Sequence, residues 1–241
     1  MRSILDLPRL GDEPDAPFPP TRLALKSPNG LLAWGGDLHP RRLLRAYREG
    51  IFPWYSQGQP VLWWSPAPRC VIHPEGVYLS TRTRRRYNTG RYRLTADNAF
   101  SDVIVGCAAP RDRDQGTWIT TELRAAFERL HRWGHAHSIE VWRDDELCGG
   151  IYGLALGSAF FGESMFSRST DASKIALVAL CRLLAGWGFG LLDCQVANPH
   201  LRRMGAVDIS RVSFERHLQR LVNEPRESRS WRDCAHFEAR W

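Results

Sequence analysis

The chain has 241 residues, of which 43% are hydrophobic and 24% are charged. This composition is typical of a folded globular protein and excludes extensive disorder or a fibrous repeat. The length admits one large domain or a domain with a smaller appendage. A net charge of +7, carried almost wholly by arginine, favours a polyanionic partner such as nucleic acid or an anionic membrane surface. A high genomic G+C content would produce the same arginine bias.

The cysteines and the apolar stretches indicate in which cellular compartment the protein works. The six cysteines lie far apart, with no C-x-x-C pair and no Cys/His spacing typical of a zinc site. Residues 1–12 carry acids and a proline where a secretory signal would need an apolar stretch. Residues 175–192 contain Arg182 and three glycines, which favours a buried helix followed by a strand over a membrane span. We therefore expect a cytoplasmic protein with reduced thiols and no membrane segment.

The N-terminal part is predicted to contain little regular structure. Its first thirty residues are rich in proline, but Pro40 is suited to a first helical position and Gly50 to a helix stop. The helix between them has the apolar residues Leu43, Leu44 and Tyr47. Residues 51–55 and 62–66, dense in aromatics and prolines, are expected to form one wall of a cleft. A second helix is predicted to begin at Ser80-Thr81, where the basic run starts.

The second half predicts a β-meander, a helix and a returning strand. Residues 137–142, 146–156 and 158–164 have the pattern of three strands joined by short turns. Thr170-Asp171 can cap a helix that ends at Gly186 and Gly188. The apolar residues of that helix are expected to face the sheet: Ile175, Leu177, Val178, Leu180, Leu183 and Leu184. A strand at 191–196 and a helix at 198–204 would follow, an order that resembles the core of the acetyltransferase-like fold.

The strand at 191–196 carries two polar residues. Because side chains alternate along a strand, Asp193 and Gln195 are expected on one face, and Leu192, Cys194 and Val196 on the other. Such a pair is either a buried hydrogen-bonded network or a catalytic pair. A strand end that meets a helix start, here at Asn198, favours a cleft and therefore a site.

Glu163 places a carboxylate near the end of an apolar strand, where a charge needs a partner. That partner is either an arginine such as Arg168 or a cationic substrate. The segment is not a nucleophile elbow, because Phe166 stands where the motif requires a second glycine. Trp54 and Trp118 can stack on a nucleobase, although a core position is the commoner role of a tryptophan.

His135 and His137 flank one alanine and have the residue types of metal ligands. No third ligand is evident in the sequence. We therefore interpret both as ordinary surface or core histidines and predict no metal site.

Short motifs along residues 28–221 occur in an order characteristic of leucyl/phenylalanyl-tRNA-protein transferases, and the chain resembles that family. Besides Tyr47, the motifs are Asn29-Gly30-Leu31-Leu32-Ala33, Gly35-Gly36-Asp37-Leu38, Gly50-Ile51-Phe52-Pro53-Trp54, Leu62-Trp63-Trp64-Ser65-Pro66, Gly116-Thr117-Trp118-Ile119, Gly134-His135-Ala136-His137-Ser138-Ile139-Glu140-Val141-Trp142, Gly162-Glu163-Ser164-Met165-Phe166-Ser167 and Asp193-Cys194-Gln195.

The resemblance implies an α+β protein. A small N-terminal domain at residues 1–112 would precede an acetyltransferase-like (GNAT-like) catalytic domain at 113–241, whose mixed, mostly antiparallel sheet is flanked by helices. The boundary would fall near residues 110–116. The implied reaction moves Leu, Phe or Met from aminoacyl-tRNA to the N-terminal α-amine of proteins that begin with Arg or Lys, within the N-end rule degradation pathway. Because the ester is already activated, no cofactor is expected, and we expect a monomer.

The resemblance also implies residue roles. Asp193 and Gln195 would be catalytic, either relaying the amine proton or leaving it to the terminal ribose of the tRNA. Glu163 and Asn198 would bind the acceptor. The aminoacyl-adenosine would contact Tyr47, Trp54 and Trp118, and its side chain a pocket of Ile151, Phe160, Met165, Leu177, Leu180 and Leu192. The tRNA phosphates would contact Arg82, Arg84, Arg85 and Arg86.

Two other functions compete with this interpretation. An acyl-CoA-dependent N-acetyltransferase would share the fold, but it needs a glycine-containing loop for pyrophosphate, and residues 166–171 contain no glycine. A non-catalytic RNA-binding module would use the basic run and the tryptophans. It would not explain why Asp193, Gln195 and Glu163 should share a cleft.

Overall fold

The computed structural model describes residues 7–109, 117–225, 230–232, 237 and 240–241. The strands are β1 (Arg9–Leu10), β2 (Leu31–Gly35), β3 (Phe52–Pro53), β4 (Leu62–Trp64), β5 (Arg69–Ile72), β6 (Arg93–Ala96), β7 (Ala136–Arg143), β8 (Glu146–Leu156), β9 (Ala159–Ser167), β10 (Leu191–Gln195) and β11 (Val207–Ile209). The helices are α1 (Pro40–Arg48), α2 (Thr81–Tyr87), α3 (Phe100–Ala108), α4 (Thr121–Arg132), α5 (Ala172–Gly186), α6 (Pro199–Arg203) and α7 (Arg211–Leu221).

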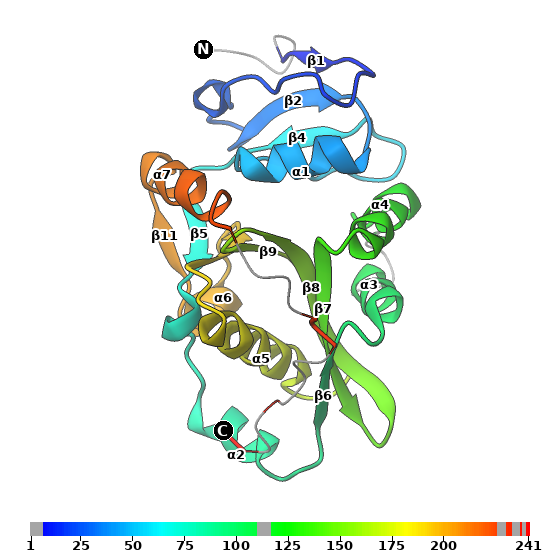
Figure 1. Ribbon diagram of the computed structural model, residues 1–241, viewed down its shortest axis with the longest axis vertical. Coiled ribbons are helices and arrows are strands. Elements are labelled where there is room, and N and C mark those ends of the chain that lie inside the picture. The colour runs from blue at the N-terminus through cyan, green and yellow to red at the C-terminus, as the bar shows by residue number, and fades with distance from the viewer. Residues whose placement is uncertain (1–6, 110–116, 226–229, 233–236, 238–239) are drawn as a thin grey trace.

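The strands form two sheets (Figure 1). The smaller has four strands in the order β1-β2-β4-β3, and the larger has seven in the order β11-β5-β10-β9-β8-β7-β6. In Figure 1, α1 lies between the small sheet and the rest of the molecule. The expected α+β class with a mixed, mostly antiparallel sheet is confirmed, since only β9 and β10 pair in parallel within the larger sheet.

Local signals explain where the helices begin. Pro40 occupies the first turn of α1, and Ser80 caps α2 by accepting a hydrogen bond from the Thr83 N–H. Asn198 caps α6 in the same way. The expected cap of α5 is wrong in its detail: Asp171 has a left-handed φ of 66° and makes no side-chain cap bond. Its carboxylate instead pairs with Arg86 and Lys174, which occupies the oxygens that a cap would use.

The larger sheet opens at its centre. The meander β7-β8-β9 is antiparallel as predicted, and β10 returns beside β9 after α5. The β9–β10 pairing runs only from Ala159 to Phe161 on β9, although β9 continues to Ser167. The two parallel strands therefore diverge, which exposes the second half of β9 to a cleft.

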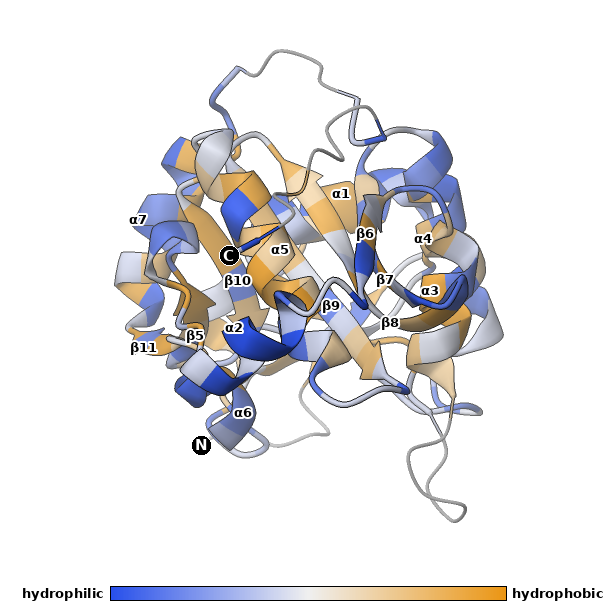
Figure 2. Ribbon diagram, turned by 90° about the horizontal axis from the view of Figure 1, so that it is seen from below, coloured by the Kyte–Doolittle hydropathy of each residue, from blue (hydrophilic) through white to orange (hydrophobic). Residues whose placement is uncertain are grey.

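Helices cover both faces of this sheet. α5 packs on one face, where Ile151 and Phe160 join its core, and Figure 2 shows α5 as largely apolar and α2 as largely hydrophilic. α3 and α4 pack on the other face with Tyr152 and Phe161. The same core cluster includes Tyr47 of α1, so one hydrophobic core connects the small sheet with the large one.

The sheets divide the chain between Trp64 and Arg69, because β5 and β6 both pair within the larger sheet. Residues 69–109 therefore lie with the large sheet, whereas the sequence-based division placed them in the N-terminal domain. The expected boundary itself, at residues 112 and 113, lies outside the described residues and stays a prediction. Among the helices of the described residues, none is long and apolar enough to cross a membrane.

Candidate active site

An open cleft of about 930 Å³ lies where β9 and β10 diverge. One side is formed by Phe52, Pro53, Trp54 and Trp118. The other sides come from residues 162–168 of β9 and the turn after it, from Leu177 of α5, and from the end of β10 with the start of α6. The cleft therefore joins the aromatic segment of the small sheet to the opened centre of the large sheet.

Glu163 lies at the bottom of this cleft and forms a hydrogen-bonded trio with Tyr47 and Gln195. Its Oε1 accepts a hydrogen bond of 2.7 Å from the Tyr47 hydroxyl and another of 2.9 Å from Nε2 of Gln195. When Glu163 is ionised, the second bond fixes the orientation of the Gln195 amide, because only the amide nitrogen can donate to a carboxylate oxygen. The carbonyl oxygen of Gln195 is therefore the end available to a ligand N–H in the cleft.

Burial raises the pKa of Glu163 to about 8, and the nearby Asp193 charge adds to the shift. The hydrogen bonds from Tyr47 and Gln195 act in the opposite direction and limit this rise. The pKa of Tyr47 is itself raised well above its usual value, first by burial and then by the charge of Glu163. Tyr47 therefore stays a neutral donor, and the charge of Glu163 can change near neutral pH.

Asp193 is fully buried and faces a cation that the sequence did not indicate. Its Oδ1 and Oδ2 accept hydrogen bonds of 2.8 Å and 2.7 Å from Nε and Nη2 of Arg69, a bidentate pair. The Arg69 guanidinium also lies over the rings of Phe52 and Phe214, with its Cζ 4.9 Å and 4.6 Å from their centroids. The only sequence signal for this contact is an arginine that begins a buried strand.

The expected alternation of β10 is wrong at its last two residues. Leu192, Cys194 and Gln195 all line the cleft, whereas Asp193 lies inside the protein. The reason is a bulge between Asp193 and Gln195 in the pairing with β5, together with a left-handed φ of 61° at Gln195. Asp193 stabilises this bend, because its Oδ1 also accepts a 2.9 Å hydrogen bond from the Gln195 main-chain N–H.

Of the three aromatic residues expected at the aminoacyl-adenosine, two line the cleft. Trp54 is 44% exposed and its ring packs at a tilt against that of Trp64, while Trp118 is partly buried. The aromatic segment is fixed to the Trp118 loop by a 3.1 Å hydrogen bond between the hydroxyls of Tyr55 and Thr120. Tyr47 is fully buried on the inner face of α1 and does not line the cleft, so its assignment to the adenosine stays a prediction that this placement does not support.

The residues expected at the side-chain pocket divide similarly. Ile151, Met165, Leu177 and Leu192 line the cleft and form an apolar slot beside Gln195. Phe160 and Leu180 do not line the cleft and lie in the core on the α5 face. Phe160 packs there against Trp231, with 5.7 Å between the ring centroids. Phe160 and Leu180 therefore lie outside the side-chain pocket in which they were expected.

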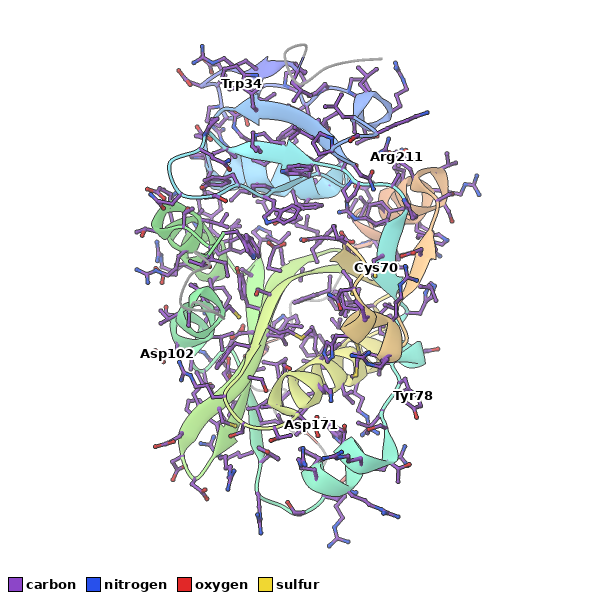
Figure 3. The ribbon with its side chains drawn as sticks, turned by 180° about the vertical axis from the view of Figure 1, so that it is seen from behind. Trp34, Cys70, Tyr78, Asp102, Asp171 and Arg211 are labelled. Carbon is purple, nitrogen blue, oxygen red and sulfur yellow. The ribbon has the colours of Figure 1, made fainter. Side chains whose placement is uncertain are left out.

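Asn198 lines the cleft, and its Oδ1 accepts a 2.9 Å hydrogen bond from the Leu201 N–H. The basic run forms α2, on which Arg82, Arg84 and Arg85 are exposed. Arg86 instead pairs with Asp171 at 2.5 Å, at the start of α5, where Figure 3 labels Asp171. Since Ser173 of α5 lines the cleft, α2 is anchored close to one end of it.

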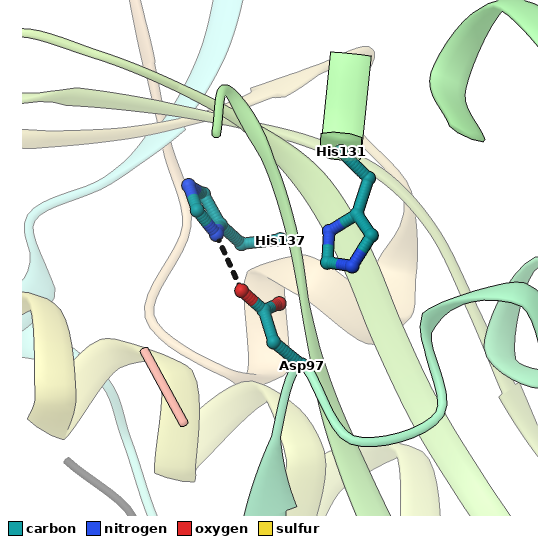
Figure 4. Close-up of side chains that lie close together, drawn as sticks. All are labelled: Asp97, His131 and His137. Carbon is teal, nitrogen blue, oxygen red and sulfur yellow. Dashed lines mark hydrogen bonds and ion pairs between the residues drawn. The ribbon is translucent and has the colours of Figure 1, made fainter. Parts of the chain in front are cut away.

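A second polar cluster consists of Asp97, His131 and His137, whose potential ligand atoms lie within 4.8 Å of one another (Figure 4). Nδ1 of His137 is 2.7 Å from Asp97, its Nε2 is 3.2 Å from the Gly134 carbonyl, and Nδ1 of His131 is 2.8 Å from the Ala136 carbonyl. A metal ion would have to replace these bonds. We interpret the cluster as a network that joins α4, β7 and the turn after β6.

The opened mixed sheet, the apolar slot and the oriented amide are an arrangement suited to an α+β enzyme that holds its substrates in a cleft. The model of the leucyl/phenylalanyl-tRNA protein transferase family matches residues 71–219, and that of the family's N-terminal domain matches residues 36–67. The chain belongs to this family of aminoacyltransferases.

Curated relatives agree over nearly the whole chain. A leucyl/phenylalanyl-tRNA–protein transferase from Alkalilimnicola ehrlichii is 56% identical over 220 residues, covering 91% of this chain and 85% of its own. One from Stutzerimonas stutzeri is 54% identical over 218 residues, covering 90% and 96%. A solved GCN5-related N-acetyltransferase from Kribbella flavida matches with 8% identity and a TM-score of 0.36, covering 68% of this chain and 58% of its own. At that score the structural match adds no argument.

Proposed function

We propose that the chain transfers Leu, Phe or Met from charged tRNA to the N-terminal α-amine of proteins that begin with Arg or Lys. The observation that carries this proposal is the Gln195 amide, whose nitrogen is held by Glu163 so that its carbonyl is presented beside an apolar slot. An amine that attacks an ester needs to be oriented in this way. The relatives named above carry a name that states such a transfer.

In the reaction, the amine nitrogen attacks the ester carbonyl carbon, the C–N bond forms and the ester C–O bond breaks. The leaving ribose oxygen takes a proton, and the amine loses one. A terminal α-amine, with a pKa of about 7.7–8.0, is partly unprotonated near neutral pH. Gln195 therefore has only to accept an N–H hydrogen bond and aim the lone pair, while the proton passes through Gln195 or to the ribose.

Asp193 acts in this scheme as a positioning residue. It is 0% exposed and its contacts are with Arg69 and the Gln195 main chain, so it holds the bulge rather than the substrate. Glu163 would pair with the basic side chain of the acceptor, because both of its hydrogen bonds to side chains of the described residues end on Oε1 and leave Oε2 for a ligand. Asn198, at the same end of the cleft as Gln195, is a second candidate for the acceptor.

The donor would lie along the other half of the cleft. Trp54 and Trp118 offer faces for the terminal adenine, and the slot of Ile151, Met165, Leu177 and Leu192 suits an unbranched or γ-branched side chain. Apolar selection is worth only about 1–3 kcal/mol per methylene. We therefore expect Leu, Phe and Met to be accepted together.

The exposed arginines of α2 are the proposed binding groups for tRNA phosphates. Arg86 is engaged by Asp171, so Arg82, Arg84 and Arg85 are the free positions for this role. Replacing these three residues with alanine should flatten the dependence of log affinity on log salt by roughly 0.7–0.9 for each phosphate that is no longer bound. A slope unchanged in the triple variant would move the tRNA site elsewhere.

The start of α5 speaks against an acyl-CoA-dependent N-acetyltransferase. The Asp171 carboxylate lies where a pyrophosphate would approach the helix N-terminus, and two basic side chains already pair with it. A non-catalytic RNA-binding module would have no use for a Gln195 amide that Tyr47 and Glu163 hold at the cleft. We also propose that the chain acts as a monomer in the cytoplasm and marks proteins for N-end rule degradation.

The test is incubation with radiolabelled leucyl-tRNA and a peptide that begins with Arg, without acetyl-CoA. Labelled peptide is expected from the native chain. Gln195→Ala should lower turnover about tenfold to a hundredfold, the equivalent of one hydrogen bond to a developing charge. Gln219→Ala, exposed on α7, is the matched control and should retain full turnover. Failure of the native chain to label the peptide would reject the proposed function.

A further inference from the structure

Two cysteines meet at the bulge of β10. In the antiparallel pairing of β10 with β5, Asp193 lies opposite Val71 and Gln195 lies opposite Cys70, so Cys194 is the extra residue between them. A bulge sets two residues of one strand against a single residue of the other. Cys194 and Gln195 therefore share Cys70 as their neighbour on β5, where Figure 3 labels it.

The two thiols differ in access. Cys194 is half-buried and lines the cleft, whereas Cys70 is 1% exposed. The interaction of the two thiols is the main cause that lowers the pKa of Cys70 and the main cause that raises the pKa of Cys194. Cys70 therefore has the more acidic thiol, and the Cys194 S–H donates to the Leu192 carbonyl oxygen at 3.9 Å. Neighbouring cysteines on paired strands are close to the separation that a disulfide requires.

We propose that Cys70 and Cys194 form a disulfide when a peroxide enters the cleft, and that this bond switches the transferase off. The Cys194 sulfur, which faces the cleft, attacks a peroxide oxygen, the O–O bond breaks, and the thiol proton leaves with the other oxygen, so that a sulfenic acid and one water form. The Cys70 sulfur then attacks the sulfenic sulfur, the S–S bond closes, and the hydroxyl leaves with the Cys70 thiol proton as a second water. In sum, two thiols lose two electrons to hydrogen peroxide, and two waters form.

The loss of activity follows from the place of Cys194 in the chain. It lies between Asp193, which holds the bulge, and Gln195, whose side chain donates to Glu163. A covalent bond from Cys194 to β5 would pull the bulge toward Cys70 and move the Gln195 amide out of its orientation. Reduction of the bond would restore the trio, so the change is reversible.

The first experiment maps the bond in the full chain and does not depend on the proposed function. After hydrogen peroxide treatment and blocking of free thiols, trypsin releases Cys70 within residues 70–82 and Cys194 within residues 183–202, each peptide with a single cysteine. The expected result is a cross-linked pair of these peptides that dithiothreitol separates. Oxidation of Cys107, which also lines the cleft, without this cross-link would overturn the proposal.

The second experiment uses the transfer assay and rests on the proposed function. Peroxide should lower the turnover of the native chain about tenfold, comparable to the loss of one hydrogen bond, and dithiothreitol should restore it. Cys70→Ala and Cys70→Ser should keep turnover under peroxide, while Cys148→Ala should respond like the native chain. Equal inactivation of the Cys70 variants, or a cross-link that leaves turnover unchanged, would refute the switch. If one Cys70 variant fails to fold, the other and the cross-link map decide.

Discussion

Two buried carboxyl groups on neighbouring strands, Asp193 and Glu163, are held by opposite means. Asp193 faces the guanidinium of Arg69 in a bidentate ion pair. Glu163 faces two neutral donors, the Tyr47 phenol and the Gln195 amide, and its pKa rises to about 8. Both groups act on Gln195, one through its main chain and the other through its side chain. Asp193 is therefore a carboxylate that fixes geometry, whereas Glu163 is one whose charge a ligand can change.

Breaking the ion pair should have the largest effect. Arg69→Met leaves the Asp193 charge buried without its cation and should lower the free energy of unfolding by about 3–5 kcal/mol. Arg143→Met, which removes an exposed pair with Asp144, should change it by only about 0–1 kcal/mol. Urea unfolding of both variants measures the difference. Equal and small changes would mean that Asp193 does not depend on Arg69.

The other carboxyl group should affect the acceptor. Glu163→Gln removes the charge that would meet an acceptor side chain, and a charge-assisted hydrogen bond is worth about 1.5–3 kcal/mol. The KM of a peptide that begins with Arg should rise tenfold or more, with donor affinity nearly intact. A peptide that begins with a neutral residue is the control. Similar losses with both peptides would assign Glu163 to the chemical step or to structure.

Titration of Glu163 should give the preference for Arg-starting peptides a pH dependence. With a pKa of about 8, the ionised form increases as pH rises toward 8. The ratio of kcat/KM for Arg-starting peptides to that for neutral peptides should rise over that range and then level off. Taking this ratio cancels the titration of the α-amine, which is common to both peptides. In the Glu163→Gln variant this ratio should not change with pH. A ratio that is also independent of pH in the native chain would contradict the prediction.

The contribution of Glu163 to the free energy of unfolding should fall as pH rises, whereas the preference for Arg-starting peptides should increase. Because the pKa of Glu163 is raised from 4.5 to about 8, the folded chain keeps a proton that the unfolded chain has released between these values. The contribution of Glu163 is therefore fully present below pH 4.5 and is lost as pH rises to about 8. Glu163→Gln should make the free energy of unfolding less sensitive to pH in this window, as urea unfolding at several pH values would show.

The smallest effect is expected from Tyr47→Phe. The ring would still pack on Phe161, 5.2 Å away between centroids, but the variant would lack one hydrogen bond worth about 0.5–1.5 kcal/mol. Because that bond lowers the pKa of Glu163, the pH midpoint of acceptor preference should move upward. Tyr55→Phe, which removes the bond to Thr120, should cost similar stability without moving the midpoint. An unmoved midpoint in Tyr47→Phe would separate Tyr47 from the titration.

Sequence patterns predicted the elements of the second half closely, because strong local signals act there. Gly205 has a left-handed φ of 97°, as expected of a residue that closes a helix, and Pro40 begins α1 as predicted. The meander followed by α5 and β10 was also predicted, since its apolar periodicities are long. The resemblance pointed to Gln195, Glu163 and both tryptophans, which the structure brings to one cleft.

Contacts between distant segments could not be read from the sequence. Arg69 is separated from Asp193 by 124 positions, and nothing local distinguishes it from the other arginines. The resemblance implied a place for Tyr47 at the adenosine, whereas in the structure its hydroxyl donates to Glu163, 116 positions along the chain. The bulge at Gln195 depends on a left-handed φ that a glutamine rarely adopts, and no sequence rule for strands would introduce it.

The core that Tyr47 shares with Phe127 and Phe161 has a consequence for folding. Residues of α1 and of the small sheet, including Leu43 and Trp63, belong to one cluster with residues of β8, β9, α3 and α4. A fragment that ended after the small sheet would expose the side of α1 that the larger part covers. We therefore expect the two sheets to melt in one transition, although two family models divide the chain.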